Sequence, residues 1–142
     1  TLDVNLTGAF LCTRSAVPLI KKANGGSIVN ISSAAGRHGF PLRSPYSATK
    51  FGVIGLTQTW AMELGPSGIR VNAIAPGYFL SDLNRDYFGT PAGEALVKRV
   101  PQRRLGQPAD LDGALLLLAS DASRFMTGAV LSVDGGHSVS TL

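Results

Sequence analysis

A tyrosine and a lysine stand four residues apart in the stretch SPYSATKFGVIG, which runs from Ser44 to Gly55. Residues at i and i+4 of a helix share one face, so the phenol of Tyr46 and the ammonium of Lys50 are expected to be neighbours. A phenol with a pKa of about 10 is barely ionised at neutral pH, and a cation within about 4 to 6 Å lowers such a pKa. The pair therefore predicts general acid/base chemistry at Tyr46, toward an alcohol or a developing alkoxide.

A Tyr-x-x-x-Lys pair is by itself a weak motif, because a lysine on a helix surface is commonly just solvated. Ser33 would add a second hydroxyl on the same substrate oxygen if it lies at the end of a neighbouring strand. The alternative for Ser33 is a strand-end hydroxyl that bonds its own turn. Both alternatives stay open at the level of the residues.

Three short runs rich in Val and Ile predict the strands that must position these side chains. Long helical crossovers separate them, which favours a parallel sheet covered on both faces. No linker or repeat interrupts the chain, so residues 1–142 are expected to belong to one domain. The predicted strands are 27–32, 69–75 and 129–133, and the predicted helices are an N-terminal one, 45–64 with Ser44 as N-cap, 91–100 and 108–119.

Ligands of a parallel α/β sheet bind in the crevice outside the carboxyl ends of the strands. Ser33 follows the first predicted strand, Pro76 and Gly77 follow the second, and Tyr46 opens the helix after the first. We therefore expect these residues to converge on one edge of the sheet.

Composition argues against several other classes. The net charge of +4 is spread without a block of like charges, and aromatic residues do not interleave with basic ones, which disfavours nucleic-acid binding. The longest apolar run, 114–119, is far shorter than the roughly 20 residues that span a bilayer, so no membrane segment is expected. The single cysteine, Cys12, excludes an intrachain disulfide and fits a reducing, cytoplasmic setting; we expect it to be buried on the first helix.

The two histidines, His38 and His137, raise the alternatives of a metal site or a serine hydrolase. They lack the H-x-x-x-H spacing, so no metal is expected. The stretch ISSAAG lacks the leading glycine of the G-x-S-x-G turn, which disfavours a serine nucleophile.

Five segments in order resemble the short-chain dehydrogenase/reductase family, in its Rossmann-fold branch, over essentially the whole chain. They are DVNLTGAF around Asn5, GGSIVNISS ending in Ser33, YSATK thirteen residues later, ELGPSGIRVNAIAPG, and LLLLASDASRFMTGAVLSVDGG. The resemblance implies hydride transfer between NAD or NADP and a secondary alcohol or ketone, of the sugar-acid, polyol or 3-oxoacyl type.

The same resemblance implies a catalytic tetrad of Asn5, Ser33, Tyr46 and Lys50. Tyr46 would be the acid/base, Ser33 would orient the substrate oxygen, and Lys50 would also bond the nicotinamide ribose. Asn5 would hold a water in a proton relay, although an N-cap of the first helix is an equal alternative on sequence alone.

The stretch PGYFLS resembles the family loop that holds the nicotinamide carboxamide. Its cofactor-binding residues would be Pro76, Gly77, Phe79 and Ser81, with Ser81 standing where the family usually has Thr. Residues 80–100 correspond to the variable substrate lid, which would bring Leu83, Tyr87 and Phe88 to the pocket unless they only pack.

The family's Gly-rich dinucleotide loop has no counterpart in these 142 residues, which contain neither G-x-G-x-x-G nor a P-loop. Three strands are also few for an open sheet. We therefore expect the C-terminal catalytic part of a doubly wound Rossmann fold, with the N-terminal strands absent and the choice of NAD or NADP open. The alternative is a cofactor-free fragment that is inert or acts only as an assembly partner.

Small residues form a second stripe on the helix 45–64, at Ala48, Gly52, Gly55 and Thr59. Each interior glycine costs about 1 kcal/mol relative to alanine, so the stripe predicts the close approach of another helix. In the family this helix packs against its twin, which implies a homodimer or homotetramer.

Overall fold

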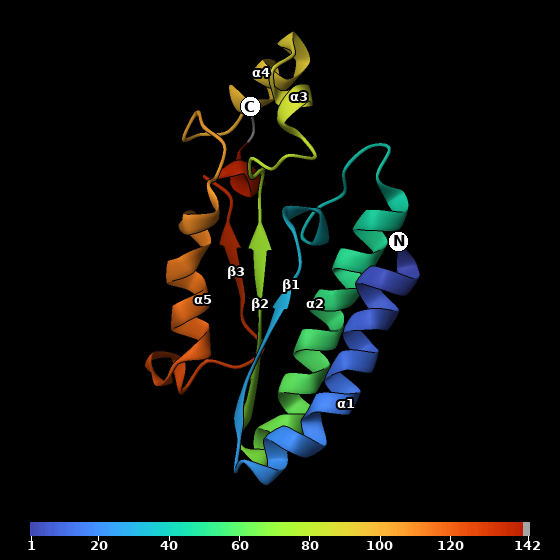
Figure 1. The fold of residues 1–142 in the computed structure, drawn as a ribbon, viewed down its shortest axis with the longest axis vertical. Helices are drawn as coiled ribbons and strands as arrows, with labels where there is room; N and C mark the ends of the chain where they lie inside the picture. Colours follow the sequence, from blue (N-terminus) through green and yellow to red (C-terminus); the bar gives the residue numbers. More distant parts are fainter. Residues whose placement is uncertain (141–142) are drawn as a thin grey trace.

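Three parallel strands form the sheet of the computed structural model, which describes residues 1–140 (Figure 1). They are β1 (Gly26–Ile31), β2 (Ile69–Pro76) and β3 (Val130–Val133), in the spatial order β1-β2-β3. Their register pairs Gly26 with Ile69 and Ala73 with Val130. The predicted α/β class, the three strands and their parallel direction are confirmed, with strand ends that differ from the prediction by one residue.

Helices cover both faces of this sheet, as expected for a doubly wound fold (Figure 1). Alternate residues of each strand point to opposite faces. Ile28 packs in the cluster under α2, whereas the hydroxyl of its neighbour Ser27 donates to the Leu118 carbonyl of α5 at 2.7 Å.

The helical elements fall into two groups. The α-helices are α1 (Gly8–Lys22), α2 (Ser44–Leu64), α3 (Arg85–Phe88), α4 (Pro91–Val97) and α5 (Asp112–Ala119). The shorter turns are the π-helical η1 (Asp3–Thr7) and the 3₁₀ turns η2 (Ala34–Gly36), η3 (Gly65–Ser67), η4 (Pro108–Leu111), η5 (Asp121–Ser123) and η6 (His137–Val139).

The core lies between α2 and β2. Trp60, Ala61 and Leu64 of α2 pack against Ile69 and Val71 of β2, and all five are buried. Burying one such large apolar side chain contributes about 1.5–3 kcal/mol, so this contact is the main link between helix and sheet. It fixes the position of α2, whose first turn carries Tyr46.

Four local predictions differ from the structure. Ser44 is the first residue of α2 rather than its N-cap, and the cap position belongs to Arg43, which makes no side-chain capping hydrogen bond. Cys12 is exposed rather than buried, because α1 turns it away from the sheet and buries only Thr13 fully. The predicted helix 91–100 ends at Val97, and the predicted helix 108–119 is divided into η4 and α5.

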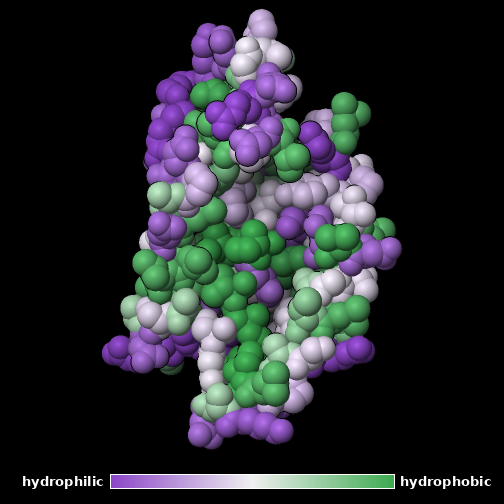
Figure 2. Space-filling model, in the orientation of Figure 1, coloured by the Kyte–Doolittle hydropathy of each residue, from purple (hydrophilic) through white to green (hydrophobic). Residues whose placement is uncertain are grey.

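Apolar side chains gather across the middle of the face shown in Figure 2. β1 is an edge strand of the described sheet, and Ile31 at its end is 53% exposed.

None of the helices in residues 1–140 has both the length and the hydropathy of a membrane-spanning segment. The same residues contain no group of three or more His, Cys, Asp or Glu that could hold a metal ion.

Candidate active site

The hydroxyl of Ser33 lies just beyond the carboxyl end of β1. Ser33 is the N-cap of η2, and its Oγ accepts a hydrogen bond from the backbone N–H of Ala35 at 3.1 Å. The turn-bonding alternative is therefore present in the structure. It is compatible with a second role, because an oxygen that accepts this bond keeps its own proton for another acceptor.

Tyr46 and Lys50 lie on one face of α2, one turn apart. The Lys50 Nζ is 5.6 Å from the centroid of the Tyr46 ring, within the range of a cation–π contact. The same ammonium donates to the Ile31 carbonyl at 3.0 Å, which ties the helix to the end of β1. Burial lowers the pKa of Lys50, because desolvation disfavours its charged form.

The turn η2 is seated directly on α2. The Ser32 hydroxyl donates to the Lys50 carbonyl at 2.9 Å. A Cβ on Gly36 would lie 2.6 Å from the same Lys50 carbonyl oxygen, so only glycine allows this approach. The contact fixes Ser33 relative to the first turns of α2.

Asn5 reaches the same helix from the other end of the sequence. Its Nδ2 donates to Thr49 Oγ1 at 3.3 Å, and that hydroxyl donates to the Tyr46 carbonyl at 2.7 Å. Asn5 lies inside the π-helical turn η1 and its N–H donates to the Thr1 carbonyl, so it is not the N-cap of the first helix. Two hydrogen bonds thus connect Asn5 to the turn that carries Tyr46.

A hollow of about 270 Å³ brings part of the predicted site together. Ser33, Tyr46 and Gly77 all line it, each from a segment next to the carboxyl end of a strand. A Cβ on Gly77 would lie 2.6 Å from the Asp134 Cβ, so glycine lets the loop after β2 press against the end of β3. The other lining residues are Ala34, Ala35, Phe40, Arg43, Tyr78 and His137.

The remaining predicted cofactor residues of the loop, Pro76, Phe79 and Ser81, do not line this hollow. Pro76 ends β2, and the exposed Ser81 donates its backbone N–H to Asn84 Oδ1 at 2.8 Å. Phe79 bridges to Gly106, and its ring occupies the space that a Cβ on Gly106 would take. The Phe79 side chain thus lines a second hollow and not the one at Tyr46.

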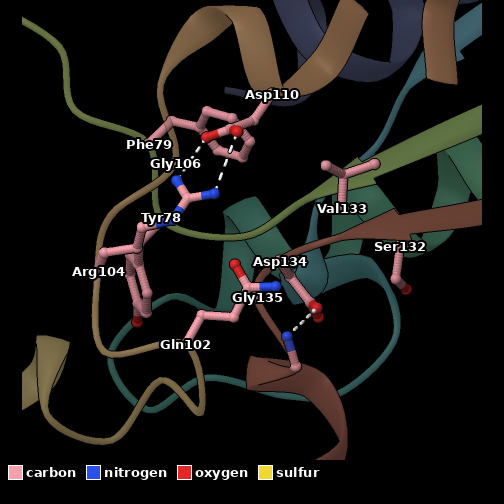
Figure 3. Close-up of a pocket in the computed structure, with 11 residues that line it drawn as sticks. Tyr78, Phe79, Gln102, Arg104, Gly106, Asp110, Ser132, Val133, Asp134 and Gly135 are labelled. Carbon is pink, nitrogen blue, oxygen red and sulfur yellow. Dashed lines mark hydrogen bonds and ion pairs between the residues drawn. The ribbon is translucent and has the colours of Figure 1, made fainter. Parts of the chain in front are cut away.

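That second hollow, of about 370 Å³, is shown in Figure 3. Arg104 donates to both carboxylate oxygens of Asp110, at 2.6 and 3.1 Å. The hydrogen bond from Arg104 lowers the pKa of Asp110 to about 2. Although burial opposes it, hydrogen bonds from Ser138 and Gly136 hold the pKa of Asp134 below its ordinary value. These bonds close the turn after β3 and the loop before η4.

The predicted lid residues do not line the hollow at Tyr46. Leu83 is fully exposed and Tyr87 is half exposed. Phe88 contacts Tyr78 edge to face, with the ring centroids 5.8 Å apart, and so reaches the hollow only through that ring.

The sequence reasoning missed six lining residues as site residues: Ala34, Ala35 and four with larger side chains, which are Phe40, Arg43, Tyr78 and His137. The His137 ring lies 5.0 Å from Tyr78 and 5.8 Å from Phe40, centroid to centroid. Burial lowers the pKa of His137, and the neighbouring His38 lowers it further. The strand-end rule could have found two of the four, because Tyr78 follows β2 and His137 follows β3.

Comparison with known proteins gives one family model and many relatives. The model described as enoyl-(acyl carrier protein) reductase matches residues 1–138. The 3-oxoacyl-(acyl-carrier-protein) reductase FabG of Thermotoga maritima is 44% identical over 135 residues, which cover 95% of this chain and 54% of that protein. The chain thus spans about half the length of the curated relatives it matches.

Solved structures agree with the described fold. A gluconate 5-dehydrogenase from Burkholderia cenocepacia, in complex with NADP and tartrate, is 38% identical with a TM-score of 0.94, over 99% of this chain and 55% of that one. A 4-hydroxyisoleucine dehydrogenase complexed with NADH is 35% identical with a TM-score of 0.93, over 99% and 58%. Two different nicotinamide cofactors therefore occur among proteins with this arrangement of strands and helices.

Proposed function

Because the chain belongs to the short-chain dehydrogenase/reductase family, we propose that it is the catalytic portion of an NAD- or NADP-dependent oxidoreductase acting on a secondary alcohol or ketone. The observation that carries this proposal is the hollow lined jointly by Ser33, Tyr46 and Gly77, with Lys50 over the Tyr46 ring. A small-molecule substrate of the sugar-acid, polyol or 3-oxoacyl type fits its size. We further propose that residues 1–142 form part of one domain.

The described residues fit the nicotinamide end of the cofactor. Gly77 lets the loop after β2 approach Asp134 at the end of β3, and it lines the hollow without a side chain of its own. We assign Pro76, Gly77 and Ser81 to the carboxamide, and Tyr46 with Lys50 to the ribose; Phe79 would contribute only its backbone. When bound, the nicotinamide supplies or accepts the hydride. No Gly-rich loop for the pyrophosphate occurs in the 142 residues.

The proton chemistry follows from the chain's own side chains. Tyr46 gives a proton to the substrate oxygen during reduction and takes it back during oxidation. The Lys50 ammonium, 5.6 Å from the ring centroid, places a positive charge beside the phenol. Ser33 uses its remaining proton to bond the substrate oxygen, since its Oγ already accepts from Ala35. Asn5 holds the first turns of α2 through Thr49 and positions a relay water.

Assembly through α2 belongs to the same proposal. Gly52 is already approached within the chain, because a Cβ there would lie 2.8 Å from Leu6 Cδ1. A Cβ on Gly55 would meet nothing within 4 Å, and Gly55 lines an open groove with Thr59 and Phe10. A second copy of α2 would fill this groove in a homodimer or homotetramer. The lone Cys12 supports a reducing, cytoplasmic setting.

The direct test follows NADH and NADPH oxidation by the protein that carries this chain, with a panel of ketones and the reverse reaction with alcohols. We expect turnover with at least one class and a loss of roughly 100-fold or more in Tyr46→Phe, because the general acid/base is removed. Most of the cofactor affinity should be retained in this variant, because the Lys50 ammonium still bonds the ribose. Tyr87→Phe removes the same hydroxyl from the half-exposed Tyr87 and serves as the matched control. Unchanged turnover in Tyr46→Phe would refute the mechanism.

A further inference from the structure

The hollow at Tyr46 continues into a neighbouring cavity of about 400 Å³. The two share Phe40, Tyr78 and His137 in their walls, and together they are called the basic cleft below. The shared rings give the cleft an apolar middle, since Phe40 and His137 stack with an interplanar angle of 25°. Tyr46 stands at one end of the cleft, and His38 lines the other.

Among residues 1–140, the charged side chains that line the basic cleft are of one sign. Arg43 lines the part at Tyr46, Arg99 lines the neighbouring part, and the two histidines lie beside them. Among the described residues that line it there is no aspartate or glutamate. Asp134 acts on His137 from outside the cleft, and its carboxylate is occupied by the N–H groups of Gly136 and Ser138, both at 2.9 Å.

Arg43 is the basic residue nearest in sequence to the reacting group, three positions before Tyr46 at the cap of α2. Burial raises the pKa of Tyr78, and Tyr87 raises it further. The positive charges of Arg43 and Arg99 oppose this rise, because both favour the ionised form of the Tyr78 hydroxyl. The two ion pairs of the described chain join Arg85 to Asp82 and Arg104 to Asp110. Within residues 1–140 no carboxylate neutralises Arg43.

We propose that Arg43 binds a carboxylate of the substrate, placed on a carbon other than the one that reacts at Tyr46. The substrate is then a hydroxy acid or the corresponding keto acid. A guanidinium suits this role because its planar donors match a carboxylate in a bidentate pair. The rings of Phe40 and Tyr78 cover the carbon chain of the molecule between its reacting end and its carboxylate. This inference rests on the proposed oxidoreductase function and specifies its substrate class.

The test compares hydroxy acids with their carboxamides, which keep the shape and lose the charge. Suitable pairs are gluconate with gluconamide and beta-hydroxybutyrate with beta-hydroxybutyramide. We expect at least one acid to exceed its amide roughly 10- to 100-fold in kcat/KM, mainly through KM, as for a hydrogen bond to a charged group. Arg43→Gln should abolish this preference with little change in kcat, and Arg43→Lys should retain part of it.

Arg124→Gln is the control, because it removes the same charge at a distance from the cleft. Arg124 follows η5 and precedes β3, so it lies at the opposite end of that strand from the cleft. This variant should keep the preference for acids over amides. Equal kcat/KM for acids and amides in the wild type would overturn the inference, as would a preference that survives in Arg43→Gln. Calorimetric titration of the same pairs separates the two proposals. Acid binding that Arg43→Gln abolishes, without any hydride transfer, would support the anion site and refute the oxidoreductase function. Absence of acid-selective binding would refute the anion site.

Discussion

Lys50 connects three parts of the site, two through its ammonium and one through its backbone carbonyl. Its ammonium lies over the Tyr46 ring and donates a hydrogen bond to the carbonyl of Ile31. Its backbone carbonyl accepts a hydrogen bond from the Ser32 hydroxyl. Partial burial strengthens these contacts and at the same time penalises the charge. The residue therefore has a measurable effect on stability that is separate from catalysis.

The sign of that effect follows from the lowered pKa of Lys50, which desolvation causes. Between the lowered pKa and the ordinary lysine pKa of 10.5, the unfolded chain binds more protons at this site than the folded chain. The free energy of unfolding should therefore rise with pH in this window, relative to Lys50→Met. Chemical denaturation of both proteins from neutral to alkaline pH measures the difference. Parallel curves would contradict the burial of a charged Lys50.

At the scale of elements, the site depends on how closely η2 rests on α2. Ser33 and Tyr46 belong to different elements, and the contact between Gly36 and the Lys50 carbonyl sets the space between them. Gly36 therefore acts on the geometry of the site without lining the hollow.

Gly36→Ala should move η2 away from α2, because its Cβ would lie 2.6 Å from a backbone oxygen that cannot rotate aside. Overpacking of this kind costs about 1–3 kcal/mol in the free energy of unfolding. We also expect lower turnover, because Ser33 shifts with η2. Urea denaturation and steady-state kinetics measure both effects. Gly65→Ala is the control, since its Cβ would meet nothing within 4 Å and it follows the end of α2 that lies away from Tyr46, and equal behaviour of the two variants would contradict the argument.

The exposed stripe of α2 makes a separate prediction about assembly. Gly55→Arg places a long side chain where its own chain offers no contact within 4 Å of the Cβ, so the fold should be kept. We expect the oligomer of the protein that carries this chain to dissociate, as measured by analytical ultracentrifugation. Gly65→Arg, equally open but at the end of the helix, should assemble normally. An oligomer that tolerates Gly55→Arg would place the interface elsewhere.

At the scale of the whole molecule, our proposal gives the 142 residues one part of a cofactor site. The hollow at Tyr46 is the proposed place of the nicotinamide end, but the chain contains no Gly-rich loop for the pyrophosphate. The edge of β1 also has no neighbouring strand within the described residues, and Ile31 at its end is 53% exposed. Both features match a chain that spans about half of its relatives.

These 142 residues alone should therefore bind NADH and NADPH more weakly than the micromolar range, because most of the polar contacts of a dinucleotide are made by its phosphates. Titration followed by cofactor fluorescence measures this affinity. Micromolar binding would show that the phosphate contacts are dispensable and would exclude the alternative of a cofactor-free assembly partner.

The sequence by itself determined the elements and their order. Val- and Ile-rich runs separated by helices are local patterns, so the parallel α/β fold and the pairing of Tyr46 with Lys50 could be predicted from spacing alone. The cap of α2 and the exposure of Cys12 were predicted wrongly, because they depend on which face of a helix the rest of the chain covers. The tertiary structure alone decided that Asn5 reaches Thr49, 44 residues away, and that Arg43 and His137 share a hollow with Tyr46. Such contacts follow from the packing of α2 and β3 against β2, which no local pattern encodes.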